Sequence, residues 1–147
     1  MVAETLKLLK KTENENVSEK ICTEKELDEL ITEKSDRGLV KKILELLQDS
    51  KAEEIVLVDV RDSSNLADYM FICEGRSHMH CRGIAENIVF RLKNHGENHL
   101  GIEGEVEGNW VLLDYGNIIL HVFHPEIRKY YNLEELYAPH QLKDDTN

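Results

Sequence analysis

Apolar residues recur at helical spacing in two segments of the chain. In the first, Asp36 is placed to cap a helix, and the apolar stripe behind it consists of Leu39, Val40, Ile43, Leu46 and Leu47. In the second, Ser77 is the cap, Gly96 ends the helix, and the stripe consists of Cys81, Ile84, Ala85, Ile88, Val89 and Leu92. Each stripe predicts a helix that buries one face against a core.

The segments around these helices have the pattern of strands. EEIVLVDV and YMFICEG are nearly continuous in apolar residues, which is typical of strands inside a covered sheet. Residues 99–104 predict a short edge strand, residues 108–123 predict a hairpin, and Pro125 begins one or two short helices. This order predicts an α/β (α+β) single domain, in which a mixed sheet of about five strands carries helices mainly on one face.

Three parts of the chain differ in composition. Residues 1–35 are acidic, lack aromatic residues and contain the polar run TENENVSEK, so we expect a flexible or loosely helical extension. A weak helix is expected over Ala3–Lys11, and a better one after Thr23. Residues 36–138 are the expected domain, and residues 139–147 an expected disordered tail.

Successive side chains of a strand point to opposite faces of the sheet, so the hairpin has two faces of different composition. A turn at Tyr115 and Gly116 places Trp110 opposite His121 and Leu112 opposite Ile119. One face is aliphatic and suits the core: Val111, Leu113, Ile118, Leu120 and Val122. The other is mixed polar and aromatic: Trp110, Leu112, Asp114, Asn117, Ile119, His121 and Phe123. Two interpretations of Trp110 stay open, because the ring can anchor a partner or pack under the C-terminal segment YYNLEELY.

Charge and cysteine content narrow the class of function. The net charge of −11 argues against phosphate-driven binding of nucleic acid as the main role of the surface, although an acidic protein can dock on a basic one. The three cysteines, Cys22, Cys73 and Cys81, form no CxxC pair and fit a reducing compartment. The N-terminus does not resemble a secretory signal or an organellar transit peptide.

The search for catalytic chemistry finds little. There is no P-loop, no dinucleotide fingerprint, no DxD pair and no metal-ligand pattern around the histidines, so the sequence predicts no catalytic residues, no cofactor and no metal. One loop is bordered by polar residues that fit a polar site, namely Asp59, Arg61, Ser64 and Asp68. Loop capping and a local ion pair explain these residues at least as well.

Several segments together resemble the Iojap-related ribosomal silencing factor family. They are VDVRDSSNLADYMFICEGRS, His80, GIEG, GNWVLLDYGNIILHVF, Arg128 and YNLEELY, in the family's order and spacing over roughly Leu39 to Tyr137. Asn117 stands where the family often has an acid, and Tyr137 where it usually has tryptophan. The resemblance implies a nucleotidyltransferase-like fold without catalytic residues.

The resemblance also implies a function. Family members bind the large ribosomal subunit through a basic protein, number fourteen of the large-subunit series, and block joining with the small subunit, which represses translation. They often form homodimers when free, and no membrane or sequence-specific nucleic acid is implied. A bacterial cytoplasmic location is expected rather than an organellar matrix. The expected partner-binding residues are Trp110, Asp114, Tyr115, His121, Glu103, Arg128 and Tyr131.

Two other functions remain to be distinguished from silencing. Organellar relatives act in assembly of the large subunit, so the chain can be an assembly factor without a silencing role. A nucleotidyltransferase-like enzyme that uses Gly75, Ser77 and Asp114 is disfavoured, because one carboxylate does not replace a metal-binding pair.

Overall fold

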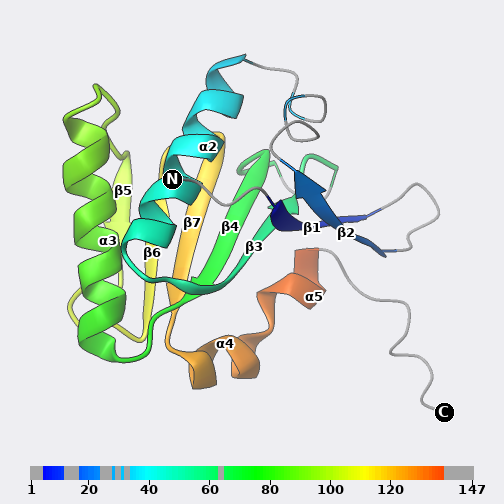
Figure 1. Cartoon of the computed structure of the whole chain (residues 1–147). Helices are drawn as coiled ribbons and strands as arrows, with labels where there is room; N and C mark the ends of the chain where they lie inside the picture. Colours follow the sequence, from blue (N-terminus) through cyan, green and yellow to red (C-terminus); the bar gives the residue numbers. More distant parts are fainter. Residues whose placement is uncertain are drawn as a thin grey trace, which may run out of the picture.

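A seven-stranded sheet forms the centre of the protein (Figure 1). The computed structural model describes residues 5–11, 17–23, 28, 31, 34–62 and 65–137. The strands are β1 (Thr5–Lys11), β2 (Val17–Thr23), β3 (Glu53–Asp59), β4 (Tyr69–Glu74), β5 (Gly101–Glu103), β6 (Trp110–Asp114) and β7 (Ile118–Phe123). Their order is β2-β1-β3-β4-β7-β6-β5. The pairs β1–β3 and β4–β7 are parallel and the others antiparallel, which confirms the predicted mixed sheet.

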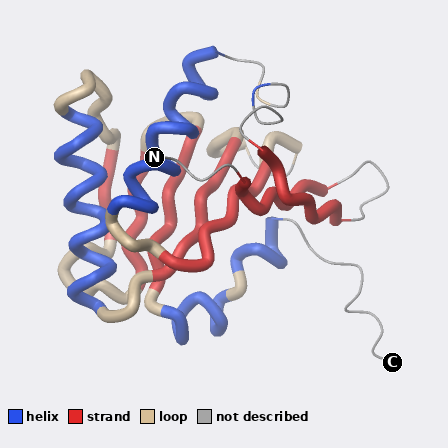
Figure 2. The backbone as a smooth tube through the Cα atoms, viewed as in Figure 1, coloured by secondary structure: helices blue, strands red, loops and turns tan. Residues whose placement is uncertain are grey.

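Two long helices cover one face of the sheet (Figure 2). They are α2 (Lys34–Asp49) and α3 (His78–Lys93), and both predicted apolar stripes are buried in one core with alternate strand residues. Ser77 caps α3 as predicted, because its hydroxyl oxygen accepts a hydrogen bond from the backbone N–H of His80 at 3.0 Å. Cys73 and Cys81 are buried, which confirms the predicted place of Cys81 in the apolar stripe, and burial raises the pKa of both thiols.

The opposite face of the sheet carries a smaller core. Two short helices, α4 (Pro125–Tyr131) and α5 (Leu133–Tyr137), lie beyond the end of β7 (Figure 1). They contribute Ile127 and Leu133 to a cluster with apolar residues of β3, β4 and β7. The prediction that helices pack mainly on one face is therefore correct for α2 and α3, whereas α4 and α5 contribute to the core on the opposite face. Among the residues described, no helix has the length and apolar character needed to cross a bilayer.

The N-terminal segment differs from the expected helix. Thr5–Lys11 form β1 and pair in parallel with β3, and Val17–Thr23 form β2 on the outside of β1. The helix predicted over Ala3–Lys11 is therefore wrong for its described part, because the open edge of β3 offers backbone hydrogen bonds that the local pattern does not reveal. The helix predicted after Thr23, like the tail at 139–147, falls mainly outside the described residues.

Deletion of residues 1–23 is expected to lower the free energy of unfolding by about 2 kcal/mol, since β1 meets β3 at four register positions and a backbone hydrogen bond contributes a net ~0.5 kcal/mol at the lower end of its range. Urea unfolding followed by circular dichroism measures this change. A deletion of residues 141–147 is the matched control. An unchanged urea midpoint after the N-terminal deletion would show that β1 does not stabilise the sheet.

Candidate functional site

The β6–β7 hairpin turns one residue later than predicted. The backbone N–H of Tyr115 donates to the carbonyl of Ile118 at 2.9 Å, so Gly116 and Asn117 form the turn. Gly116 has a φ of 88°, as the first position of a type II′ turn requires, and its N–H donates to Asp114 Oδ1 at 2.8 Å. Tyr115 is thereby spared the strained φ that a turn centred on it would impose.

This turn changes the pairing but not the faces. Trp110 lies opposite Phe123 and Leu112 opposite His121, so the predicted pairs Trp110–His121 and Leu112–Ile119 are wrong. The alternation within each strand is confirmed. All five residues of the predicted aliphatic face lie in the core beneath the helices. Trp110 and Leu112 lie on the other face with Ile119 and Phe123.

Trp110 is the centre of an aromatic group on that other face. Its ring lies 4.8 Å from the Phe123 ring and 4.9 Å from the Tyr131 ring, measured between centroids. Its Nε1–H donates to Nδ1 of His121 at 3.0 Å. The ring is only half-buried, and with Glu103, Gly104 and Leu112 it lines a hollow of about 300 Å³. The packing interpretation is supported, because Tyr131 covers one part of the ring. Another part of the ring is open to solvent, and its role as an anchor for a partner stays a prediction.

Tyr131 lies beside a second exposed tyrosine of α4. Tyr130 and Tyr131 are 79% and 52% exposed. The Tyr130 ring meets the Tyr131 ring edge-on, with centroids 5.0 Å apart. We call Trp110, Glu103, Tyr130 and Tyr131 the aromatic face. Tyr130 was not predicted, although two adjacent tyrosines on a short helix are a sequence signal for such a surface.

His121 is a buried member of the same face. Because Nδ1 accepts from Trp110, the neutral ring carries its proton on Nε2, and that nitrogen has no hydrogen-bond partner among the described residues. Burial lowers the pKa of His121 to about 4. The part of the chain that the structure describes contains no group of three or more metal-ligating side chains, and His121 acts as the acceptor that orients Trp110.

Arg128 holds the short helices against the sheet. Its guanidinium donates to the carbonyl of Glu54 at 2.8 Å, to the carboxylate of Glu74 at 3.1 Å and to both carboxylate oxygens of Glu134 at 2.8 and 3.3 Å. Burial acts to lower the pKa of Arg128, but the hydrogen bonds and charges of Glu134 and Glu74 raise it overall. The side chain is 9% exposed, so Arg128 acts on the aromatic face only by holding α4 and α5 in position.

The other three predicted partner-binding residues, Glu103, Asp114 and Tyr115, lie in different surroundings. Glu103 is exposed and lies in register with Leu112, beside the Trp110 ring. Asp114 is half-buried and caps the turn. Tyr115 packs on the helix-covered side, where burial raises its pKa to about 12 and its hydroxyl has no partner among the described residues. Tyr115 is therefore not part of the aromatic face.

Two of the predicted polar loop residues, Asp59 and Arg61, form an ion pair. Arg61 donates to both carboxylate oxygens of Asp59, at 3.0 and 2.7 Å, and lies over the Tyr69 ring at 5.2 Å. The backbone of Asp68 joins Val60 to Asn117. Ser64 lies outside the described residues. Of the two interpretations, a polar site or a local ion pair, the contacts of Asp59 and Arg61 favour the ion pair.

Comparison with known proteins relates this architecture to one family. The sequence model described as "Ribosomal silencing factor during starvation" matches residues 32–147. The chain is 36% identical to "Ribosomal silencing factor RsfS" of Bacillus subtilis over 110 residues, which are 75% of this chain and 93% of that protein. The chain belongs to the ribosomal silencing factor family.

A solved structure has a similar fold. A crystal structure of a protein from Chromobacterium violaceum matches with a TM-score of 0.68 and 30% identity, over 71% of this chain and 88% of that one. A more distant relative is "Mitochondrial assembly of ribosomal large subunit protein 1" of Mus musculus. It is 28% identical over 105 residues, which are 69% of this chain and 46% of that protein.

The silencing factor match begins after the N-terminal hairpin. Strands β1 and β2 precede residue 32, whereas α2 through α5 and the entire aromatic face lie within the matched residues. The aromatic face is therefore built wholly from the part of this chain that it shares with the family.

Proposed function

We propose that the chain binds the large ribosomal subunit through a basic ribosomal protein, protein fourteen of the large-subunit series, and that it blocks joining with the small subunit. It would thereby repress translation in the bacterial cytoplasm. The aromatic face is the proposed contact surface. The observation that carries the proposal is the half-buried Trp110, held by His121 and Tyr131 beside the exposed carboxylate of Glu103.

The chemistry of this face suits a basic protein. Tryptophan and tyrosine contribute most to binding hot spots, and here Trp110 and the exposed rings of Tyr130 and Tyr131 lie together. The net charge of −11 favours approach to a positively charged partner embedded in RNA. The family membership and the printed name of the Bacillus relative support silencing as the outcome of binding.

Silencing is tested with purified ribosomal subunits. The two subunits are mixed with a saturating amount of the protein and sedimented on a gradient, and the fraction that joins is expected to fall. The variant Trp110→Ala, which weakens the proposed contact, should restore joining at the same concentration. If the subunits join as readily with the wild-type protein as without it, the silencing proposal fails.

The contribution of Trp110 is measured directly. Trp110→Ala is expected to weaken binding to the large subunit by roughly thirtyfold, about 2 kcal/mol, as for a typical hot-spot residue. Tyr131→Ala should weaken binding in the same direction. The matched control is Phe90→Ala, because Phe90 is an aromatic residue that is 63% exposed on α3, on the other side of the sheet.

Thermal melting of each variant separates binding from folding. We expect Trp110→Ala to melt as a folded protein, since the ring is half-buried and lies outside the larger core. Normal binding by a folded Trp110→Ala protein would show that the contact lies elsewhere. Loss of binding by Phe90→Ala instead would place it on α3.

Assembly of the large subunit is a second candidate function. The name of the mouse relative favours it. Sedimentation profiles of cells that lack the protein distinguish the two functions. Accumulation of large-subunit precursors during growth indicates assembly, whereas an excess of joined ribosomes during starvation indicates silencing.

A further inference from the structure

A hollow with a positively charged rim lies between α2 and α3. It has a volume of about 340 Å³, within the range of small-molecule sites. Its lining residues are Lys34, Gly38, Leu39, Lys42, Leu92, His95 and Glu97. These residues come from the first half of α2, from the end of α3 and from the turn after it, so the hollow lies toward the end of the helix layer away from α4 (Figure 1).

The lysines of α2 are separated by a gap that a ligand can enter. Lys34, Gly38 and Lys42 are spaced four residues apart and lie on one face of the helix. Gly38 has no side chain, and a Cβ built there meets nothing within 4 Å. The gap between the two ammonium groups is therefore open. Lys42 also forms an ion pair with Glu45, with Nζ and Oε1 3.4 Å apart, and an ammonium group has two further protons to donate.

His95, in the turn after α3, adds a third basic group. Its Nδ1 lies 3.0 Å from the carbonyl oxygen of Arg91, which only accepts, so Nδ1 carries a proton. The second ring nitrogen, Nε2, is left for a ligand and becomes a donor when the ring is protonated. The carboxylate of Glu97 is the one acidic group that lines the hollow, against three basic ones.

The floor of the hollow is apolar. Leu92 is fully buried and Leu39 is half-buried, and both belong to the core beneath the helices. A ligand that matches this surface carries negative charge at one end and a flat or apolar group at the other. The positive rim also contrasts with the net charge of −11, which repels anions from the molecule as a whole.

We propose that this hollow binds a phosphate ester of nucleotide size. The phosphate lies between Lys34 and Lys42 within reach of His95, and the nucleoside rests on Leu39. The same chemistry is available from a free nucleotide and from a nucleotide within an RNA strand. This site is independent of the aromatic face, which lies on the other side of the sheet.

Binding is tested on the full chain by nuclear magnetic resonance titration of backbone amides. The probes are adenosine monophosphate, adenosine without phosphate, and a five-nucleotide RNA. We expect the phosphate-bearing probes to shift amides of α2 and of residues 92–97, and adenosine to shift them far less. An RNA that binds at least tenfold more tightly than the mononucleotide identifies RNA as the source, and equal affinities identify a free nucleotide.

The variants use the open position at Gly38. Gly38→Glu places a carboxylate in the gap and should weaken binding by about tenfold or more, equivalent to ~1.4 kcal/mol. Gly38→Ala is the matched control, because it keeps the gap uncharged and favours the helix. Glu97→Gln should strengthen binding, since it removes the one carboxylate that lines the hollow.

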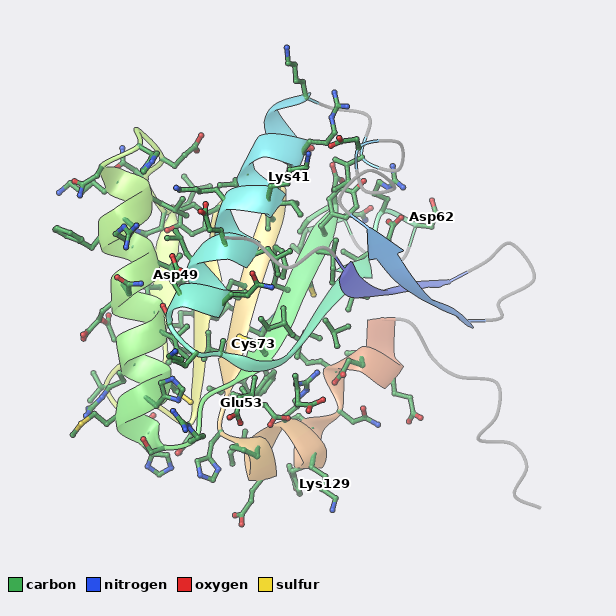
Figure 3. All side chains as sticks on the ribbon, in the orientation of Figure 1. Lys41, Asp49, Glu53, Asp62, Cys73 and Lys129 are labelled. Atoms are coloured by element: carbon green, nitrogen blue, oxygen red, sulfur yellow. The ribbon has the colours of Figure 1, made fainter. Side chains whose placement is uncertain are left out.

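A charge control guards against unspecific attraction. The double variant Lys34→Gln with Lys42→Gln should weaken binding, whereas Lys51→Gln with Lys129→Gln removes the same charge elsewhere and should not. Figure 3 shows Lys129 on α4, far from α2, on which Lys41 is labelled. The proposal is overturned if no phosphate-bearing probe binds at millimolar concentration, or if Gly38→Glu and Gly38→Ala bind equally well.

Discussion

Replacement of Arg128 by alanine is expected to lower the free energy of unfolding by about 3 kcal/mol, the lower end of the range for a buried ion pair that loses one partner. The guanidinium connects three elements, because Glu54 belongs to β3, Glu74 to β4 and Glu134 to α5. Without it, the carboxylates of Glu74 and Glu134 face each other with no cation between them. Both are about one-fifth exposed, so water relieves part of the cost.

Replacement of Arg128 should weaken binding to the large subunit as well as lower stability. The hydrogen bonds of Arg128 hold α4 and α5 against the sheet, and α4 carries Tyr130 and Tyr131. We therefore expect Arg128→Ala to weaken large-subunit binding even at temperatures where the domain remains folded. Arg128→Lys keeps the charge but loses the planar fork that reaches several acceptors at once, and it should lie between the wild type and Arg128→Ala.

Urea unfolding and binding of large subunits measure the two effects. Lys129→Ala is the matched control, because Lys129 is the next residue on α4 and is exposed. If Arg128→Ala and Lys129→Ala unfold at the same urea concentration, the contacts of Arg128 contribute nothing to stability. If Arg128→Ala is less stable but binds normally, the aromatic face does not depend on α4 being held in place.

Acidification is expected to remove up to about 3 kcal/mol of stability through His121. Burial lowers the pKa of the folded ring from 6.5 to about 4. Between these values the unfolded chain takes up a proton that the folded chain does not, so protonation favours unfolding. The contribution is fully present above pH 6.5 and is lost as the pH falls toward 4. A difference of about 2.5 pH units, at ~1.36 kcal/mol each, gives this upper value.

The physical cause lies in the surroundings of the ring. His121 is 4% exposed, and Nδ1 is already the acceptor for Trp110. A proton on Nδ1 turns that acceptor into a donor and sets it against the indole N–H. Acid should therefore loosen Trp110 as well as destabilise the fold. Because Trp110 is the single tryptophan of the chain, its fluorescence reports on this contact.

The pH dependence of urea unfolding tests this expectation, with His121→Gln as the control. Glutamine does not titrate, and its side-chain oxygen can accept from Trp110. The difference in unfolding free energy between the wild type and His121→Gln should change as the pH falls from 7 to 4. A constant difference over that range would show that His121 titrates alike in the folded and unfolded chain.

The sequence alone determined the elements whose pattern is strong and local. The stripes behind Asp36 and Ser77 have a helical period, and both became helices that bury those stripes. The hairpin at residues 108–123 alternates with a period of two, so its two faces were known before its register. The segments shared with the family also predicted Trp110 and Tyr131 as site residues. The sequence shows their order along the chain but not that their rings are in contact.

Tertiary structure decided everything that depends on a distant partner. TLKLLKK has no clear period, and it became a strand because the edge of β3 was open to pair with it. In the sequence, Arg128 looks like an exposed residue of a short helix. In the structure it is buried against Glu54 and Glu74, which lie more than fifty positions earlier in the chain. The Trp110–Tyr131 contact likewise needs α4 to fold back on the sheet. Local periodicity reports which face of an element is apolar, whereas the partner of a polar or aromatic group is set by chain segments that the pattern does not connect.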